Sequence, residues 1–207
     1  MKFLWLIVGS FLIVNGQQTN NNDYINISPP RLDDKTVIID GYLDEPVWTS
    51  ASSRSGFRSY LPVDGRPAED DTEIRIWYSP TALYVGIIAH EIHGEVRSTL
   101  ADRDNLDNED FILIVLDTYN DKRSAFTLAV NPIGQQADGT LTDRSTTGRR
   151  SVLPFSIDDN PDYVFSSRGQ LTDDGFIVEI KIPFKSLRYR NAATQNWGFN
   201  VLRKVQH

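Results

Sequence analysis

The apolar residues of this chain recur in short runs with a period of two, and turn-forming residues separate the runs. Residues 73–78 alternate between polar and apolar side chains, residues 79–82 suit a turn, and residues 83–89 return as a second run. Because successive side chains of a strand point to opposite faces, this pattern predicts a hairpin that buries one face. The predicted inward positions are Ile74, Ile76, Leu83, Val85 and Ile87.

Residues 111–116 are apolar at every position, so a strand covered on both faces is the simplest account of them. No long segment has the 3.6-residue period of a helix, and only residues 45–51 and 184–187 are candidates for short helices. The sequence therefore predicts an all-β domain: a two-sheet antiparallel β-sandwich of jelly-roll or immunoglobulin-like type, with one or two short helices. The other predicted strands are residues 37–39, 124–130, 176–182 and 197–202.

The N-terminal residues 1–16 have the pattern of a signal peptide. Lys2 supplies a positive charge, and the apolar run at residues 3–14 is shorter than the roughly 20 residues that span a membrane. An uncleaved N-terminal anchor is the alternative. Residues 17–34 are polar and predict a linker, which leaves residues 35–207 for the folded domain. Because the chain stops directly after a strand, we expect a fragment whose C-terminal part is missing.

Charge and cysteine content limit the classes of function. The net charge of −7 argues against nucleic acid as a partner, because phosphate binding needs a concentrated basic face. The chain has no cysteine, so an exported domain of this kind would depend on its core rather than on disulfides. With the signal peptide, this favours a bacterial envelope protein, in the periplasm or at the outer membrane or cell surface of a Gram-negative bacterium.

A series of motifs resembles family 9 carbohydrate-binding modules. Residues 39–48 read IDGYLDEPVW, which resembles the family's opening IDG-x-x-DE-x-x-W, and the hairpin at residues 73–85 resembles its second signature. The resemblance implies an extracellular β-sandwich that binds sugar without catalysis, with a link to carbohydrate catabolism through an attached domain. Further matches follow in the family's order at residues 110–117, 130–131, 175–179 and 197–200.

Residues 117–121, 130–139 and 182–189 are similar to bacterial envelope proteins in which such a module precedes a C-terminal domain that resembles an outer-membrane barrel. This similarity implies an alternative function, a sugar-independent accessory or docking domain that reaches the membrane through a missing C-terminal domain. A third hypothesis is glycoside hydrolase activity in the full-length protein. No spacing of carboxylates singles out a catalytic pair, so the module itself is predicted to be non-catalytic.

The chain departs from the sugar-binding members of the family at positions that contact sugar there. Those members have a carboxylate in mid-strand between the aspartates that match Asp110 and Asp117, and an arginine near the asparagine that matches Asn131. Here the two positions are Leu113 and Ala129. The resemblance therefore speaks for the fold more directly than for the sugar site.

The opening motif contains the acid pair Asp44 and Glu45, yet its residues suit structural roles. Asp40 and Gly41 suit a turn, and Asp44 suits the N-cap of a short helix. Trp48 would then point back into the sandwich, so we interpret the motif as a folding element.

Trp77 is the first candidate for sugar stacking. By alternation it shares a side with Glu73 and Arg75, and an exposed aromatic ring there would fit the apolar face of a pyranose. The alternative is that loops or the second sheet cover it, and alternation does not decide between the two. The candidate carbohydrate-binding residues are Trp77, Arg75, Tyr84 and Asn131.

The acidic run at residues 102–110 has the oxygen ligands that calcium prefers, and the family can hold structural calcium. A solvated acidic loop is the alternative. His90 and His93 also suggest a metal, but their odd separation places them on opposite faces of a strand. The sequence thus offers calcium as a candidate cofactor, with Asp102, Asp104, Asp107 and Asp110 as candidate ligands.

Overall fold

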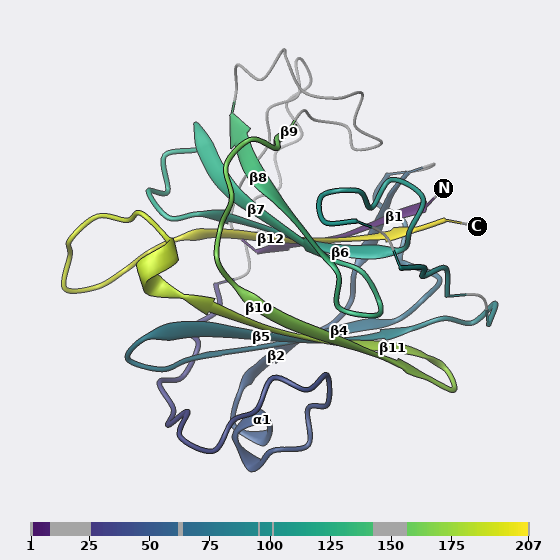
Figure 1. Ribbon diagram of the computed structural model, residues 1–207, viewed down its shortest axis with the longest axis horizontal. Helices are drawn as coiled ribbons and strands as arrows, with labels where there is room; N and C mark the ends of the chain where they lie inside the picture. The colour runs from purple at the N-terminus through teal and green to yellow at the C-terminus, as the bar shows by residue number, and fades with distance from the viewer. Residues whose placement is uncertain are drawn as a thin grey trace.

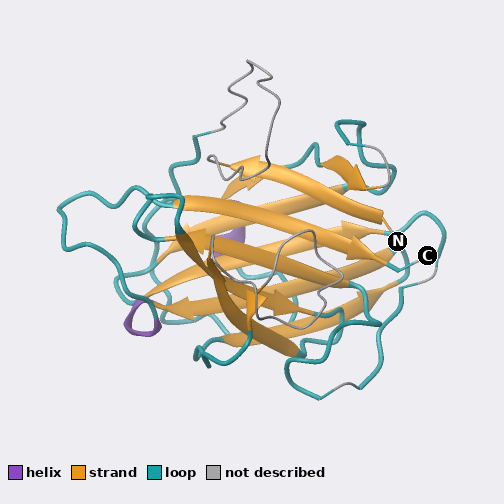
Figure 2. Cartoon of the chain, turned by 90° about the horizontal axis from the view of Figure 1, so that it is seen from above, coloured by secondary structure: helices purple, strands orange, loops and turns teal. Residues whose placement is uncertain are grey.

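The computed structural model describes residues 2–8, 26–61, 64–94, 96–100, 102–142 and 157–206. Its strands form two antiparallel sheets that lie face to face (Figure 1), and loops gather at both ends of the sandwich (Figure 2). This arrangement confirms the predicted β-sandwich. Two short helices, α1 (Pro46–Thr49) and the 3-10 helix η1 (Phe184–Ser186), fall within the segments predicted as helical. Within the described ranges, no helix is long and apolar enough to cross a membrane.

One sheet has seven strands in the order β3–β1–β12–β6–β7–β8–β9. Both faces of its central strand β6 are covered, since all seven of its residues are buried, and this confirms the prediction for residues 111–116. The strands are β1 (Lys2–Val8), β3 (Arg58–Leu61), β6 (Phe111–Asp117), β7 (Ser124–Val130), β8 (Gln136–Thr142), β9 (Ile157–Asp158) and β12 (Gly198–Val205).

The other sheet has five strands in the order β10–β11–β5–β4–β2. Its strands β4 and β5 form the predicted hairpin, and all five side chains predicted to point inward are buried. The strands are β2 (Ser52–Arg54), β4 (Thr72–Tyr78), β5 (Ala82–His90), β10 (Ser166–Thr172) and β11 (Gly175–Pro183).

The inner faces of the two sheets meet in one apolar core. Ile114 on β6 and Val178 on β11 are both fully buried there, as is Leu128 on β7. Burying one such side chain stabilises the fold by about 1.5–3 kcal/mol. The inward-facing apolar side chains of the strands therefore contribute much of the stability.

The N-terminal segments also contribute to the sandwich. Strand β1 pairs antiparallel with β12 on one side and with β3 on the other, and it consists of residues predicted as part of the signal peptide. Within the predicted linker, the carbonyl of Pro30 accepts a hydrogen bond from Tyr78 N at 3.0 Å, and Leu32 N donates to the Tyr78 carbonyl at 2.8 Å. Residues 9–25, which hold the rest of the predicted signal peptide and linker start, lie outside the described residues.

A third layer lies against the outer face of the five-stranded sheet. It consists of residues 30–51 with helix α1, below β2 and β5 in Figure 1. Trp48 of α1 meets Trp77 of β4 edge to face, with ring centroids 5.8 Å apart. Trp77 in turn stacks on Tyr84 of β5 at 3.9 Å. All three side chains are buried, so this layer has an apolar core of its own.

One carboxylate fastens this layer to the sheet. Glu179 on β11 is fully buried, and its Oε2 accepts hydrogen bonds from Asp40 N at 2.9 Å and Gly41 N at 3.2 Å. Gly41 has a φ of +95°, which favours glycine, and an added Cβ would lie 3.3 Å from the backbone of Gly169. The chain bends at Asp40 and Gly41 as predicted, but residues 37–39, predicted as a strand, form none. The bend is held by a residue near the other end of the sequence.

The start of α1 differs from the prediction. The N-cap is Glu45 rather than Asp44, and its side chain makes no capping bond. Glu45 Oε1 instead accepts a hydrogen bond from Ile38 N at 3.0 Å. Glu45 therefore braces the loop that precedes the helix, while Pro46 is the first residue of the helix.

Burial raises the pKa of Glu179 to about 7, and the charges of Glu45 and Asp40 act in the same direction. The two N–H donors lower it in part. Oε1 of Glu179 and Oε2 of Glu45 are both buried without a hydrogen-bond partner. An ionised Glu179 therefore destabilises the folded state relative to a protonated one.

We expect the free energy of unfolding to fall as the pH rises from about 4.5 to about 7. In this window the folded state keeps a proton on Glu179 that the unfolded chain has released, so stability falls by up to about 1.4 kcal/mol for each pH unit. Glu179→Gln keeps an acceptor for both N–H groups and removes the titration. Its thermal unfolding should therefore depend less on pH than that of the wild type.

The matched control is Asp159→Asn, since Asp159 is an exposed carboxylate. This variant should follow the wild-type pH profile. A Glu179→Gln profile parallel to the wild type across the same window would contradict the expectation.

Candidate functional site

Trp77 lies on the outer face of the five-stranded sheet, the side that alternation indicated. It is nevertheless completely buried, because the third layer covers this face. The structure thus has the second of the two arrangements that the sequence left open. Trp77 offers no ring face to solvent, which corrects the expectation of an exposed stacking platform at this position.

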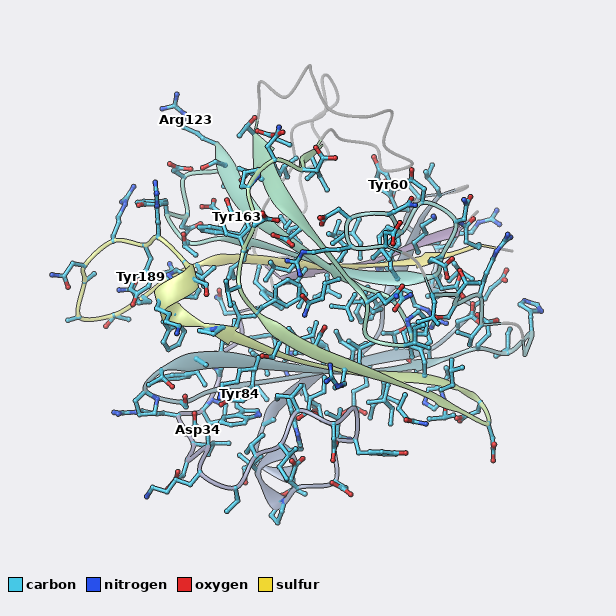
Figure 3. All side chains as sticks on the ribbon, viewed as in Figure 1. Asp34, Tyr60, Tyr84, Arg123, Tyr163 and Tyr189 are labelled. Carbon is cyan, nitrogen blue, oxygen red and sulfur yellow. The ribbon has the colours of Figure 1, made fainter. Side chains whose placement is uncertain are left out.

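Tyr84 and Arg75 are also engaged with protein groups. The buried Tyr84 hydroxyl donates to Asp34 Oδ2 at 2.8 Å, and Figure 3 shows the two side by side under the five-stranded sheet. Burial, together with this carboxylate, raises the pKa of the Tyr84 hydroxyl. Arg75 stays partly exposed and donates from Nε to Glu73 Oε1 at 2.8 Å. Tyr84 is therefore part of the third layer rather than of the surface.

Asn131 follows β7 and is completely buried. Its Oδ1 accepts hydrogen bonds from Gln135 N at 2.8 Å and from Ile133 N at 3.2 Å. Its Nδ2 donates to the Thr99 carbonyl at 3.4 Å. Asn131 thus braces the turn between β7 and β8, in the other sheet from Trp77, Arg75 and Tyr84. The structure does not bring the four candidate sugar-binding residues together.

The four candidate calcium ligands make separate contacts. Asp110 accepts from Arg97 N at 2.9 Å and from Gln206 N at 2.8 Å, and Asp104 accepts from Asp138 N at 3.0 Å. The contacts of Asp102 and Asp107 are made by their carbonyl groups, with Asn105 N in the first case and with Lys204 Nζ in the second. Among the residues that the structure describes, no three His, Asp or Glu side chains form a group able to hold a metal ion. The structure therefore does not bring the four aspartates together, and calcium binding at them stays a prediction.

Leu113 and Ala129 lie directly opposite each other in the pairing of β6 with β7. The positions aligned with the family's carboxylate and arginine are therefore cross-strand neighbours on one face. Here both side chains are buried in an apolar cluster on the outer face of the seven-stranded sheet. The other buried members are Leu106, Phe111, Val115, Ala125, Leu141 and Leu202. This face has no polar group at the two positions that matter for sugar in the family.

An aromatic cluster that the sequence did not single out lies at the end of the sandwich where β6 ends and β12 begins. The ring centroids of Tyr189 and Trp197 are 5.5 Å apart, and Phe184 lies 6.0 Å from Trp197 and 6.3 Å from Tyr189. Tyr119, from the turn after β6, has the Arg190 guanidinium 6.0 Å from its ring centroid. Tyr119 is 36% exposed and Tyr189 39%. We call Tyr119, Phe184, Tyr189 and Trp197 the aromatic end.

Hydrogen bonds hold the segments of the aromatic end in place. Thr118 Oγ1 donates to the Arg188 carbonyl, which ties the turn after β6 to the loop after η1. Trp197 Nε1 donates to Gln195 Oε1 at 3.1 Å, and Gln195 Nε2 donates to the Arg190 carbonyl at 2.9 Å. Figure 3 shows Tyr189 and Arg123 at the same end of the molecule. The aromatic end is thus a braced surface built from two separate stretches of sequence.

Comparison of the sequence alone finds no relative: no family model matches the chain, and no curated protein matches it. The structure, in contrast, resembles solved β-sandwich modules. It is similar to a family 9 carbohydrate-binding module from Caldicellulosiruptor kristjanssonii solved in complex with cellotriose, with a TM-score of 0.55 and 16% sequence identity. That match covers 84% of this chain and 80% of the module.

A structure of a family 9 module from the same organism in complex with glucose matches with a TM-score of 0.51, also at 16% identity, over 81% of each chain. This chain therefore has the fold of a family 9 carbohydrate-binding module. The resemblance found from the sequence motifs is confirmed at the level of the fold.

We expect Trp77→Ala to destabilise the protein by about 3–5 kcal/mol, because it removes a large ring from the interior of the third layer. Tyr119→Ala removes a partly exposed ring and should change stability by less than about 1 kcal/mol. Urea unfolding followed by circular dichroism measures both. Equal, small effects of the two substitutions would show that Trp77 is not buried in solution.

Proposed function

We propose that this chain is a non-catalytic carbohydrate-binding module, exported to the cell envelope, that recognises a glycan at its surface. The observation that supports the proposal is the likeness of fold, over more than four fifths of the chain, to a module solved with cellotriose. Fold alone does not fix function, so the proposal also needs a surface of the right chemistry. The aromatic end supplies one, because partly exposed rings match the apolar faces of sugars.

The buried carboxylates favour binding over catalysis. Hydrolysis of a glycosidic bond needs two carboxyl groups, roughly 5–10 Å apart, on either side of an accessible bond. Glu179, Asp110 and Asp117 are instead buried, and each accepts hydrogen bonds from backbone N–H groups of neighbouring segments. These carboxylates hold the fold together, which leaves them poorly placed to act on a substrate.

A second candidate function is a docking domain that binds protein and no sugar, attached to a membrane protein. One specific observation favours it. Leu113 and Ala129 replace the carboxylate and the arginine that the family resemblance places at these positions, and both are buried among apolar side chains. A module that lost its sugar site in this way could keep the fold for another purpose.

A glycan array separates the two candidates. We expect the folded chain to bind at least one glycan, since the aromatic end offers stacking surface. The control is the same protein after thermal unfolding, which should bind none. A folded chain that binds no glycan on a broad array of neutral and acidic structures would overturn sugar binding. Turnover of a glycoside by the purified chain would overturn the non-catalytic assignment.

Export is tested separately with a reporter enzyme. We expect residues 1–34 to carry alkaline phosphatase that lacks its own signal across the inner membrane, because Lys2 and the apolar run at residues 3–14 have the form of a signal peptide. Phosphatase activity in intact Gram-negative cells measures the outcome. A variant with two aspartates within the apolar run is the control and should be inactive. Equal activity of the two would contradict export by this segment.

A further inference from the structure

The aromatic end combines two properties that occur together at no other place described above: partly exposed rings and a local excess of positive charge. Its rings come from the turn at residues 118–123 and the segment at residues 184–197. These two segments hold one acidic residue, Asp121, and the basic residues Lys122, Arg123, Lys185, Arg188 and Arg190. In a chain with a net charge of −7, the sign of the charge is reversed at this end.

We infer that the aromatic end is the glycan-binding surface and that its ligand is an acidic oligosaccharide, one that carries uronate carboxylates. This inference rests on the proposed sugar-binding function and adds to it the place of binding and the class of ligand.

The rings provide the stacking part of such a site. Tyr189 and Trp197 are tilted by 51° to each other at a centroid distance of 5.5 Å, and Phe184 packs edge to face against both. Phe184 is partly buried against the main core, so the exposed Tyr189 rests on an anchored support. A ring held in this way offers contact area to a pyranose at little cost in side-chain entropy.

The arginines provide the charged part. Arg188 and Arg190 flank Tyr189 in the sequence, and both are exposed. A guanidinium presents a planar fork of donors that matches a carboxylate, and it remains charged at any physiological pH. The contact of Arg190 with the Tyr119 ring limits the positions of its guanidinium. In a uronate the carboxylate projects from the rim of the sugar ring, so a sugar stacked on Tyr189 brings it toward these groups.

Two further acidic residues lie near the aromatic end, Asp117 and Asp162. Asp117 is buried, and its carboxylate accepts hydrogen bonds from Tyr119 N and Lys122 N, so it is not exposed at the surface of the aromatic end. The strand-free segment before β10 reaches this end through Ser186 Oγ, which donates to the Val164 carbonyl. That segment carries Asp162 two residues earlier, which limits the positive region on that side.

Titration calorimetry of the full chain tests the inference. The probes are trisaccharides of galacturonate, mannuronate and guluronate, each with its carboxyl-reduced, neutral counterpart. We expect at least one acidic trisaccharide to bind tenfold or more tightly than its neutral counterpart, and its affinity to fall as salt rises from about 50 to about 500 mM. Tyr189→Ala and Arg190→Ala should each weaken binding about tenfold.

Matched control substitutions lie elsewhere on the surface. Tyr42 is exposed like Tyr189 but stands between Asp40 and Asp44, and Arg54 is an exposed arginine on β2. Tyr42→Ala and Arg54→Ala should leave the affinity unchanged. Thermal melting of all four variants establishes that they are folded, and the indole N–H signal of Trp197, unlike those of Trp48 and Trp77, should shift on titration.

The outcomes distinguish this inference from the proposed function. Equal affinity for acidic and neutral trisaccharides, or full affinity in the Tyr189→Ala and Arg190→Ala variants, would overturn the inference while sugar binding stands. Failure to bind any glycan, acidic or neutral, would overturn the inference and the proposed function together.

Discussion

The pair of hydrogen bonds from Asp40 N and Gly41 N to the buried carboxylate of Glu179 is the contact on which the arrangement of this protein depends. It holds residues 30–51 against the five-stranded sheet and so encloses the stacked rings of Trp77 and Tyr84. Burial of an ionisable group in this contact costs free energy, since burial disfavours the charged form and raises the pKa of Glu179 to about 7. The hydrogen bonds are also directional, so they fix one turn to one strand. The consequence for function is that this face of the sandwich is closed.

The outer face of the seven-stranded sheet is covered by different residues. The cluster around Leu113 and Ala129 is apolar and buried there, and Leu106 of the acidic loop and Ile157 of β9 pack on it. With both outer faces of the sheets covered, the loops at the ends of the sandwich are the exposed parts of this scaffold. Loops on a rigid sheet scaffold are common binding elements. The aromatic end consists of two such segments, distant in sequence and braced by side-chain and backbone hydrogen bonds.

The alternation of apolar and polar residues predicted the hairpin of β4 and β5, because it indicates which side chains share a face. The continuous apolar run of β6 predicted a strand covered on both faces. Neither pattern could predict what covers a face, and for that reason Trp77 could be placed on its side of the sheet but not judged exposed or buried. The arrangement of Asp102, Asp104, Asp107 and Asp110 could not be predicted for a related reason. Residues close in sequence need not have side chains that converge, and Asp110 accepts a hydrogen bond from the backbone N–H of Gln206, far along the chain. The aromatic end joins residue 119 to residues 184–197, a contact that no local pattern contains. Locally, the sequence indicates this surface only by Arg188-Tyr189-Arg190, which lies within residues 184–197, a segment with no Asp or Glu.

The family resemblance places a carboxylate and an arginine at the positions of Leu113 and Ala129, and these two positions depend on each other. The two residues are cross-strand partners, so a carboxylate and an arginine in their places would compensate each other's charge. Either one alone, buried in this apolar cluster, would be an unpaired charge that costs several kcal/mol. The pair is therefore stable in two states, both charged or both apolar, and intermediates are disfavoured. The alternation that builds the sandwich is compatible with either state, and the fold is shared with a module at 16% sequence identity. At the exposed ends of the sandwich, in contrast, a change of side chain does not leave a buried charge.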